Sequence, residues 1–260
     1  PLSWASAQNN LGSALQTIGQ RTSDIAVLEK AQSAFSLARQ VYKRKEFPLD
    51  WAMTQHNVGN TLHLMATVSS EPSHYRNAIA AFRQALQEFT RERTPIQWAN
   101  TTASMGSSFQ GLAYTDETTQ SLKDCVAARR AALEVLTDEN APVEWATAQN
   151  GLGTCLLNLS TRESDGTYLD DAMAAFEASK IVFTRQDQPL QWAFAENNIG
   201  DVHWNLATLG GGRPDYLMAI DRFESAKQGF GEAGHFAAVM LAERKIGLIR
   251  ESLGDGADTP

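Results

Sequence analysis

A period of 47 residues runs through the whole chain. Five tryptophans recur at this interval, each with a proline three residues before it and a glycine eight residues after it. The tryptophans are Trp4, Trp51, Trp98, Trp145 and Trp192, and the glycines are Gly12, Gly59, Gly106, Gly153, Gly200 and, once more in phase, Gly247. Three residue types that stay in phase without an insertion are the signature of a repeat array. The sequence therefore predicts five full units and a sixth half-unit.

Each unit predicts a pair of helices. Trp4, Leu11 and Leu15 share one face at helical spacing, and polar residues share the opposite face. Gly19 and the polar stretch after it predict the end of this first helix. A second apolar series at helical spacing predicts the partner helix, and its members in the first unit are Leu28, Ala31, Phe35, Ala38 and Tyr42. Both helices are expected to span roughly 18–20 residues, within the usual range for globular helices.

Stacking of the units follows from their small size. No single hairpin can bury its apolar face alone, so neighbours must stack into an α-solenoid. The third unit departs from the pattern because Arg129 stands where the others have phenylalanine, and looser packing or a shifted register is expected there. The expected boundaries are repeats 1–47, 48–94, 95–141, 142–188 and 189–235, a capping helix 236–253 and a disordered tail 254–260.

The recurring residues resemble those of the tetratricopeptide repeat (TPR) family, in a long-unit variant of 47 residues. The residues that carry the resemblance in the first unit are Trp4, Leu11, Gly12, Leu15, Ala31, Phe35 and Ala38. The resemblance implies an all-α, right-handed α-solenoid that forms a single domain over 1–253. It also implies that the first helices line a concave groove, where asparagines bind the main chain of a protein ligand.

The polar arc of the first helices is the candidate binding surface. Its residues fall into columns spaced by 47, and asparagine recurs in them. An asparagine side chain offers both a donor and an acceptor, which matches a peptide backbone of any sequence. Asparagine is a poor helix former, so its recurrence within helices indicates a function that offsets this cost. Alternatively, these residues are a solvated polar face, or they bridge adjacent units. The candidate groove residues are Asn9, Asn10, Ser13, His56, Asn57, Asn60, His63, Gln110, Asn150, Thr154, Asn158, Asn197, Asn198, Asp201, Trp204, Asn205 and Arg244.

Trp204 is the tryptophan that breaks phase. It is a candidate aromatic anchor at the C-terminal end of the groove. The alternative is that it packs under the last helix, near Phe236 and Met240. His56 and His63 are seven residues apart on one helix, about 10 Å along its axis, which is too far to chelate one metal ion. No metal site is expected.

Composition and motifs exclude several classes of function. The net charge of −8 argues against nucleic-acid binding, which needs a basic face. There is no apolar run long enough to span a bilayer and no signal peptide, so a cytoplasmic protein with no membrane partner is expected. Cys125 and Cys155 fall at core-type positions and are too few for a disulfide framework. No catalytic or phosphate-binding motif occurs, so we expect neither enzyme activity nor a cofactor.

The function that the sequence favours is that of a protein–protein interaction module, a scaffold that binds a peptide or protein segment in its Asn-rich groove. The alternative is a regulatory or sensor array of a larger bacterial signalling or effector enzyme, with the catalytic domain outside this chain. The first hairpin shows an apolar face with nothing upstream to cover it, so we expect self-association through this repeat or a longer parent protein. The last helix is expected to face water with Arg244, Lys245, Arg250 and Glu251.

Overall fold

The computed structural model describes residues 1–115 and 119–254. Within these ranges the chain forms helices and no strand, which confirms the predicted all-α fold of helical hairpins. The chain divides into two compact units, Pro1–Val135 and Leu136–Pro260. The elements are α1 (Leu2–Thr22), α2 (Ile25–Val41), α3 (Pro48–Ser69), α4 (Pro72–Ala85), α5 (Pro95–Ala113), α6 (Gln120–Leu133), α7 (Pro142–Glu163), the short 3-10 helix η1 (Gly166–Tyr168), α8 (Leu169–Ser179), α9 (Pro189–Leu206), the π-helical turn η2 (Ala207–Gly211), α10 (Arg213–Glu232) and α11 (Phe236–Leu253).

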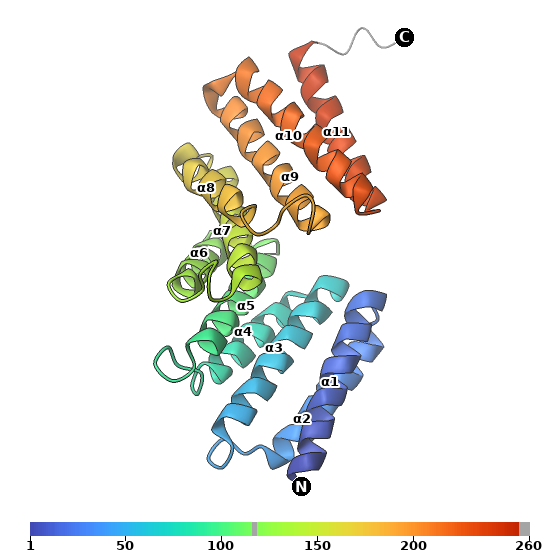
Figure 1. Cartoon of the computed structure of the whole chain (residues 1–260), viewed down its shortest axis with the longest axis vertical. Coiled ribbons are helices and arrows are strands. Elements are labelled where there is room, and N and C mark those ends of the chain that lie inside the picture. The colour runs from blue at the N-terminus through green and yellow to red at the C-terminus, as the bar shows by residue number, and fades with distance from the viewer. Residues whose placement is uncertain (116–118, 255–260) are drawn as a thin grey trace. The chain divides into compact units, whose positions relative to one another are not determined.

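The helices pack as consecutive hairpins within each unit (Figure 1). In the first unit, α1 pairs with α2, α3 with α4 and α5 with α6, and α2 also packs against α3 and α4 against α5. In the second unit, α7 pairs with α8 and α9 with α10, and α11 packs against α10. No helix in the described part of the chain is long and apolar enough to cross a membrane.

A glycine and a phenylalanine hold each hairpin together. A Cβ atom on Gly12 would lie 2.6 Å from Cε1 of Phe35, so only glycine lets the ring sit against the first helix. The same contact recurs between Gly59 and Phe82, Gly153 and Phe176, and Gly200 and Phe223. In the third hairpin, Arg129 occupies the equivalent place over Gly106, so the predicted shift of register does not occur.

Two of the periodic tryptophans, Trp51 and Trp98, lie between hairpins. Trp51 packs against Ala38 and Tyr42 of the preceding hairpin, and Trp98 packs against Ala85 and Phe89 in the same way. Arginines cover the outer faces of these rings, at 5.3 Å from guanidinium to ring centroid for Arg44 on Trp51, 5.7 Å for Arg91 on Trp98 and 5.3 Å for Arg185 on Trp192. Trp51 and Trp98 therefore stabilise the stacking of neighbouring hairpins, as predicted, whereas Trp4 on α1 is 43% exposed.

Two features of the helices differ from the sequence prediction. Gly19 does not end α1, because the helix continues to Thr22 and its C-cap, Ser23, adopts a left-handed conformation with φ 52°. Gly19 is buried instead, with Leu28 of α2 filling the space that a side chain would need. The second helices are mostly shorter than the predicted 18–20 residues, with 14 in α4 and α6 and 11 in α8.

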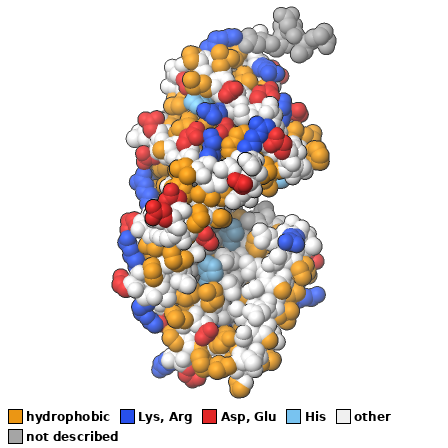
Figure 2. All heavy atoms as spheres, viewed as in Figure 1, with side chains coloured by type: hydrophobic (Ala, Val, Ile, Leu, Met, Phe, Trp, Pro, Cys, Tyr) orange, Lys and Arg blue, Asp and Glu red, His pale blue; other side chains and the backbone are white. Residues whose placement is uncertain are grey.

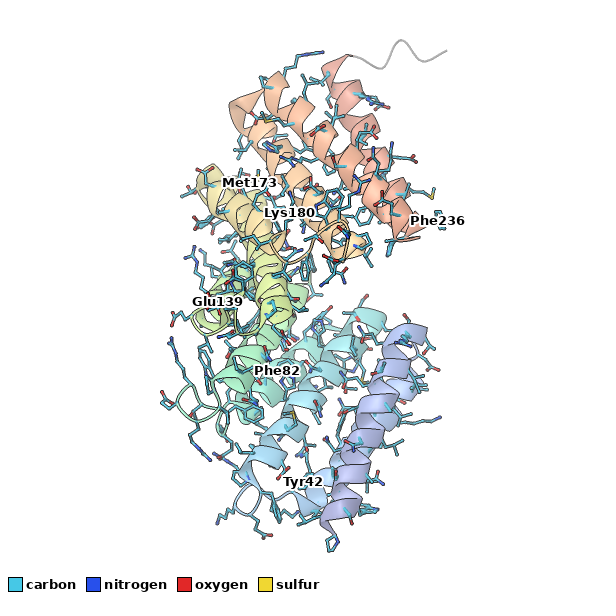
Figure 3. The ribbon with its side chains drawn as sticks, viewed as in Figure 1. Tyr42, Phe82, Glu139, Met173, Lys180 and Phe236 are labelled. Carbon is cyan, nitrogen blue, oxygen red and sulfur yellow. The ribbon has the colours of Figure 1, made fainter. Side chains whose placement is uncertain are left out.

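The last helix has the predicted bounds but not the predicted polar surface. Phe236 is 74% exposed and Met240 is 70% exposed, and Figure 3 shows Phe236 projecting from the start of α11. Lys245 turns inward, whereas Arg244 and Glu251 are exposed as expected. The disordered tail predicted over 254–260 lies outside the described residues, apart from Gly254.

Candidate binding surface

The candidate surface consists of the polar columns on the first helices. In the first unit these helices are α1, α3 and α5, and in the second unit they are α7, α9 and α11. The structure brings many of the predicted groove residues together in pairs, because their side chains form hydrogen bonds from one first helix to the next. Bridging of adjacent hairpins, one of the three sequence interpretations, is therefore observed for these residues.

Asn9 links α1 to α3. Its Oδ1 accepts hydrogen bonds from Thr54 Oγ1 at 3.3 Å and from Asn57 Nδ2 at 3.4 Å. Asn9 and Asn57 are both half-buried, whereas Asn10 is exposed. Ser13 donates to the Asn9 carbonyl at 3.1 Å within its own helix. The single proton of Thr54 Oγ1 is shared with the Asp50 carbonyl at 2.8 Å, so Asn57 is the main donor that orients the Asn9 side chain.

Two histidines link α3 to α5. Nδ1 of His56 lies 3.0 Å from Thr101 Oγ1, and its Nε2 lies 2.9 Å from Asn60 Nδ2. Because an amide nitrogen can only donate, Nε2 accepts and the ring proton of a neutral His56 lies on Nδ1, where Thr101 can receive it. His63 makes a similar bridge, with Nδ1 3.1 Å from Ser108 Oγ.

Burial keeps both imidazoles uncharged at neutral pH. It lowers the pKa of His56 to about 4. The pKa of His63 is also lowered to about 4, first by burial and then by the charge of Arg129. Both rings also lie about 5.6 Å from an aromatic ring of α4, His56 from Phe82 and His63 from Tyr75. The junction between α3 and α5 is therefore polar without being charged.

A small cavity adjoins this junction. It has a volume of about 80 Å³ and is lined by Met53, His56, Phe89, Gln97, Asn100 and Thr101. Gln110, the last candidate residue in the first unit, is half-buried further along α5. This unit also holds a larger cavity of about 340 Å³, and none of its lining residues belongs to the polar columns: they are Ser36, Arg39, Gln40, Tyr42, Lys43, Arg44 and Trp51.

The junction between α7 and α9 repeats the pattern of the first unit. Asn198 Nδ2 donates to Asn150 Oδ1 at 3.1 Å, which is the same pair of repeat positions as Asn57 and Asn9. Thr161 Oγ1 donates to Asn205 Oδ1 at 3.1 Å, and Asn205 in turn donates to the Asp201 carbonyl. Thr154 donates to the carbonyl of Asn150, so most predicted groove residues of α7 and α9 take part in bonds along or between helices.

Charged side chains link α9 to α11. Lys245 Nζ lies 2.7 Å from both carboxylate oxygens of Asp201 and 3.2 Å from Asn197 Oδ1. It also lies 4.9 Å from the ring centroid of Phe223. Burial raises the pKa of Asp201, and the charge of Lys245 partly opposes this shift. The sequence analysis missed Lys245, although it lies 47 residues after Asn198 and continues that column.

The remaining candidates in the second unit have different surroundings. Trp204 packs against Phe223, Ile246 and Ile249, with its ring edge-on to Phe223 at 6.3 Å. It therefore lies under the last helix, as the alternative interpretation predicts, but the exposed Phe236 and Met240 are not its neighbours. Asn158 is half-buried and Arg244 is exposed.

A buried carboxylate forms a second charged link that the sequence analysis also missed. Glu196 on α9 is 2% exposed and pairs with Lys180, which follows α8, and with Arg222 of α10 at 3.2 Å. Lys180, which Figure 3 labels, also pairs with Glu177 at 3.0 Å. Glu196 occupies the repeat position of Gln55, whose amide bonds to Gln84 in the first unit. A charged residue at a repeat position that is glutamine in the first two hairpins, Gln8 and Gln55, is the signal that could have revealed it.

Comparisons with known proteins define neither a family nor an activity. No protein-family model and no curated protein matches the chain. Among solved structures, it is similar to the crystal structure of BtubC (BKLC) from P. vanneervenii, with 15% sequence identity and a TM-score of 0.47 over 90% of this chain and 94% of that chain. A likeness at this level carries no conclusion about what the chain binds.

Proposed function

We propose that the chain is a TPR-like interaction module and that the polar face of α1, α3 and α5 binds an extended segment of another protein. The observation that carries this proposal is the absence of formal charge from the columns of this face. Its residues are Asn9, Asn10, Ser13, Gln16, Thr17, His56, Asn57, Asn60, His63, Leu64, Ala103, Ser104, Ser107, Gln110 and Gly111.

Neutral amides and hydroxyls suit a peptide backbone. A backbone presents uncharged N–H and C=O groups, and neutral partners satisfy these without the desolvation cost of a charge. An asparagine amide has two N–H groups and two lone pairs. The bond between Asn57 and Asn9 uses one N–H of Asn57, and the bonds that Asn9 accepts use its oxygen. The N–H groups of Asn9 and the oxygen of Asn57 are thus available to a ligand.

Fixed side chains also favour binding. The bonds between first helices hold Asn9, Asn57 and His56 in one orientation before a ligand arrives. Ordering a side chain on binding costs about 0.5–1.5 kcal/mol, and a side chain that is already ordered avoids this cost. The bridging role and the proposed binding role of these residues are therefore compatible, since the bridges order the side chains before a ligand binds.

Selection from a peptide library against the full chain tests the proposal. Peptides recovered in this way should bind the double variant Asn10→Ala, Asn57→Ala at least about tenfold more weakly than the wild type, which corresponds to roughly 1.4 kcal/mol. Asn77→Ala is the matched control, because Asn77 is an exposed asparagine on the second helix α4. If the double variant and the control bind the peptides as well as the wild type does, with unchanged circular dichroism, the peptides do not use this face.

A further inference from the structure

Arg129 breaks the pattern of the hairpin core. Its repeat position is phenylalanine in the other four hairpins, namely Phe35, Phe82, Phe176 and Phe223, and each of these rings is fully buried against a glycine. Arg129 follows the same path on α6, with Nε 3.2 Å from the place where a Cβ of Gly106 would lie. The side chain passes Gly106, and its Nη2 donates to Ser107 Oγ at 2.7 Å. Ser107 belongs to the polar columns, so the guanidinium reaches the proposed binding face from the core of the hairpin.

No described residue supplies a counter-charge to Arg129. The residue is only 5% exposed, and its Nε is buried without a hydrogen-bond acceptor. Among the residues that the structure describes, no carboxylate pairs with it, and burial lowers its pKa to about 10. The neighbouring titratable group, His63, is neutral and bonded to Ser108, so it offers no negative charge.

A purely structural role does not account for this arrangement. A buried cation without a counter-ion is costly, and an apolar side chain of similar volume commonly does better at such a position. Phenylalanine fills the same space over glycine four times in this chain without any unsatisfied polar atom. The hydroxyl of Ser107 satisfies one N–H group but does not neutralise the charge.

We propose that Arg129 and Ser107 form an oxyanion site, which receives a carboxylate or phosphate group from the segment bound on the first unit. A guanidinium presents a planar fork of N–H donors that matches the two oxygens of either group. A bound oxyanion beside Ser107 supplies the counter-charge that the hairpin core lacks. The inference rests on the proposed function, since the bound segment brings the negative group, and it narrows the ligands to those with an acidic or phosphorylated residue facing the third hairpin.

Titration of the full chain with two small anions tests this site without a protein ligand. Inorganic phosphate and acetate are added separately at constant ionic strength, and the arginine Nε–H cross-peaks are followed by NMR. The Arg129 cross-peak, assigned by its loss in Arg129→Phe, should shift saturably at millimolar anion. Saturation with acetate identifies carboxylate as a ligand group, and saturation with phosphate identifies a phosphoryl group. The site does not exist if neither anion moves this cross-peak.

Two variants separate the site from general salt effects. Arg129→Phe restores the residue of the other hairpins, so it should fold, melt at a higher temperature than the wild type and show no stabilisation by either anion. Ser107→Ala should keep the fold and weaken anion binding severalfold. Equal anion-induced shifts in melting temperature for the wild type and Arg129→Phe would overturn the proposal. That result would not contradict the proposed peptide binding by the asparagines, because the peptide experiment with Asn10 and Asn57 does not depend on Arg129.

Discussion

The first helices of the two units are connected by different chemistry. In the first unit, α1, α3 and α5 are joined by amides, imidazoles and hydroxyls, such as Asn57 on Asn9 and His56 on Thr101. In the second unit, α9 is joined to its neighbours by charged groups, with Lys245 on Asp201 and Lys180 on Glu196. Figure 2 shows the contrast, since the visible face of the first unit is mainly uncharged with histidine atoms, whereas that of the second carries basic and acidic side chains.

The difference shows that one backbone arrangement accepts either kind of junction. Asn198 on Asn150 in the second unit is still the neutral pair of the first unit, so the change begins at α9 rather than at the boundary between the units. Asp201, Asn197 and Lys245 satisfy one another and leave few polar groups for a ligand. Neutral junctions leave polar groups available to a ligand, which is why the proposed binding face is that of the first unit, whereas the charged groups at the end of the second unit mainly stabilise it.

The largest expected effect comes from breaking the buried charged link. Glu196→Ala leaves Lys180 and Arg222 without their shared carboxylate at a position that is 2% exposed. The buried carboxylate makes two charge-assisted links, each worth about 1.5–3 kcal/mol, so its removal should cost about 3–5 kcal/mol in all. Urea unfolding followed by circular dichroism should show this loss of stability.

The equivalent change in the first unit provides the control. Gln55 occupies the same repeat position, is 1% exposed and bonds to the Gln84 amide. Gln55→Ala should cost only about 1 kcal/mol for the lost bond, since Gln84 is exposed and its amide can bond to water instead. Equal losses for the two variants would mean that the charged and neutral junctions do not differ energetically.

The second-largest expected effect is a loss of stability of the first unit at low pH. Because His56 and His63 have a pKa of about 4 in the folded chain and about 6.5 when unfolded, the unfolded state binds more protons between these values. Stability from the neutral rings is complete above pH 6.5 and falls as the pH drops toward 4. At pH 5 the loss is about 2 kcal/mol per histidine.

Hydrogen exchange at pH 7.5 and pH 5, corrected for the intrinsic exchange rates, locates this effect. Amides of α3 and α5 should lose protection at the lower pH, and the variant His56→Gln, His63→Gln should lose much less. Asp201 in the second unit behaves oppositely, because burial raises its pKa and the folded state takes up the proton first. A uniform loss of protection in α3, α5, α9 and α11 would contradict this contrast.

The periodicity of the sequence predicts the hairpins well and the side-chain partners poorly. Gly12 and Phe35 recur in phase, so their packing and the hairpin fold follow from the repeat alone. The polar columns can also be predicted from the sequence, but a column does not predict that His56 turns toward Thr101 and Asn60. That choice depends on the relative placement of helices in neighbouring hairpins. The pairing of Lys245 and of Glu196 was not predicted because each is the first charged member of its column, and its partner comes from another helix.

The smallest expected effect comes from the asparagine pairs, which occur in both units. Asn9→Ala leaves Asn57 without its acceptor, and Asn150→Ala does the same to Asn198. Each half-buried neutral bond contributes about 1 kcal/mol, so the two variants should lose similar stability. They should differ in binding, however, since only Asn9 belongs to the proposed face. Peptides selected against the full chain should bind Asn9→Ala more weakly and Asn150→Ala as tightly as the wild type. The reverse result would contradict the proposed face and move the binding surface to the second unit.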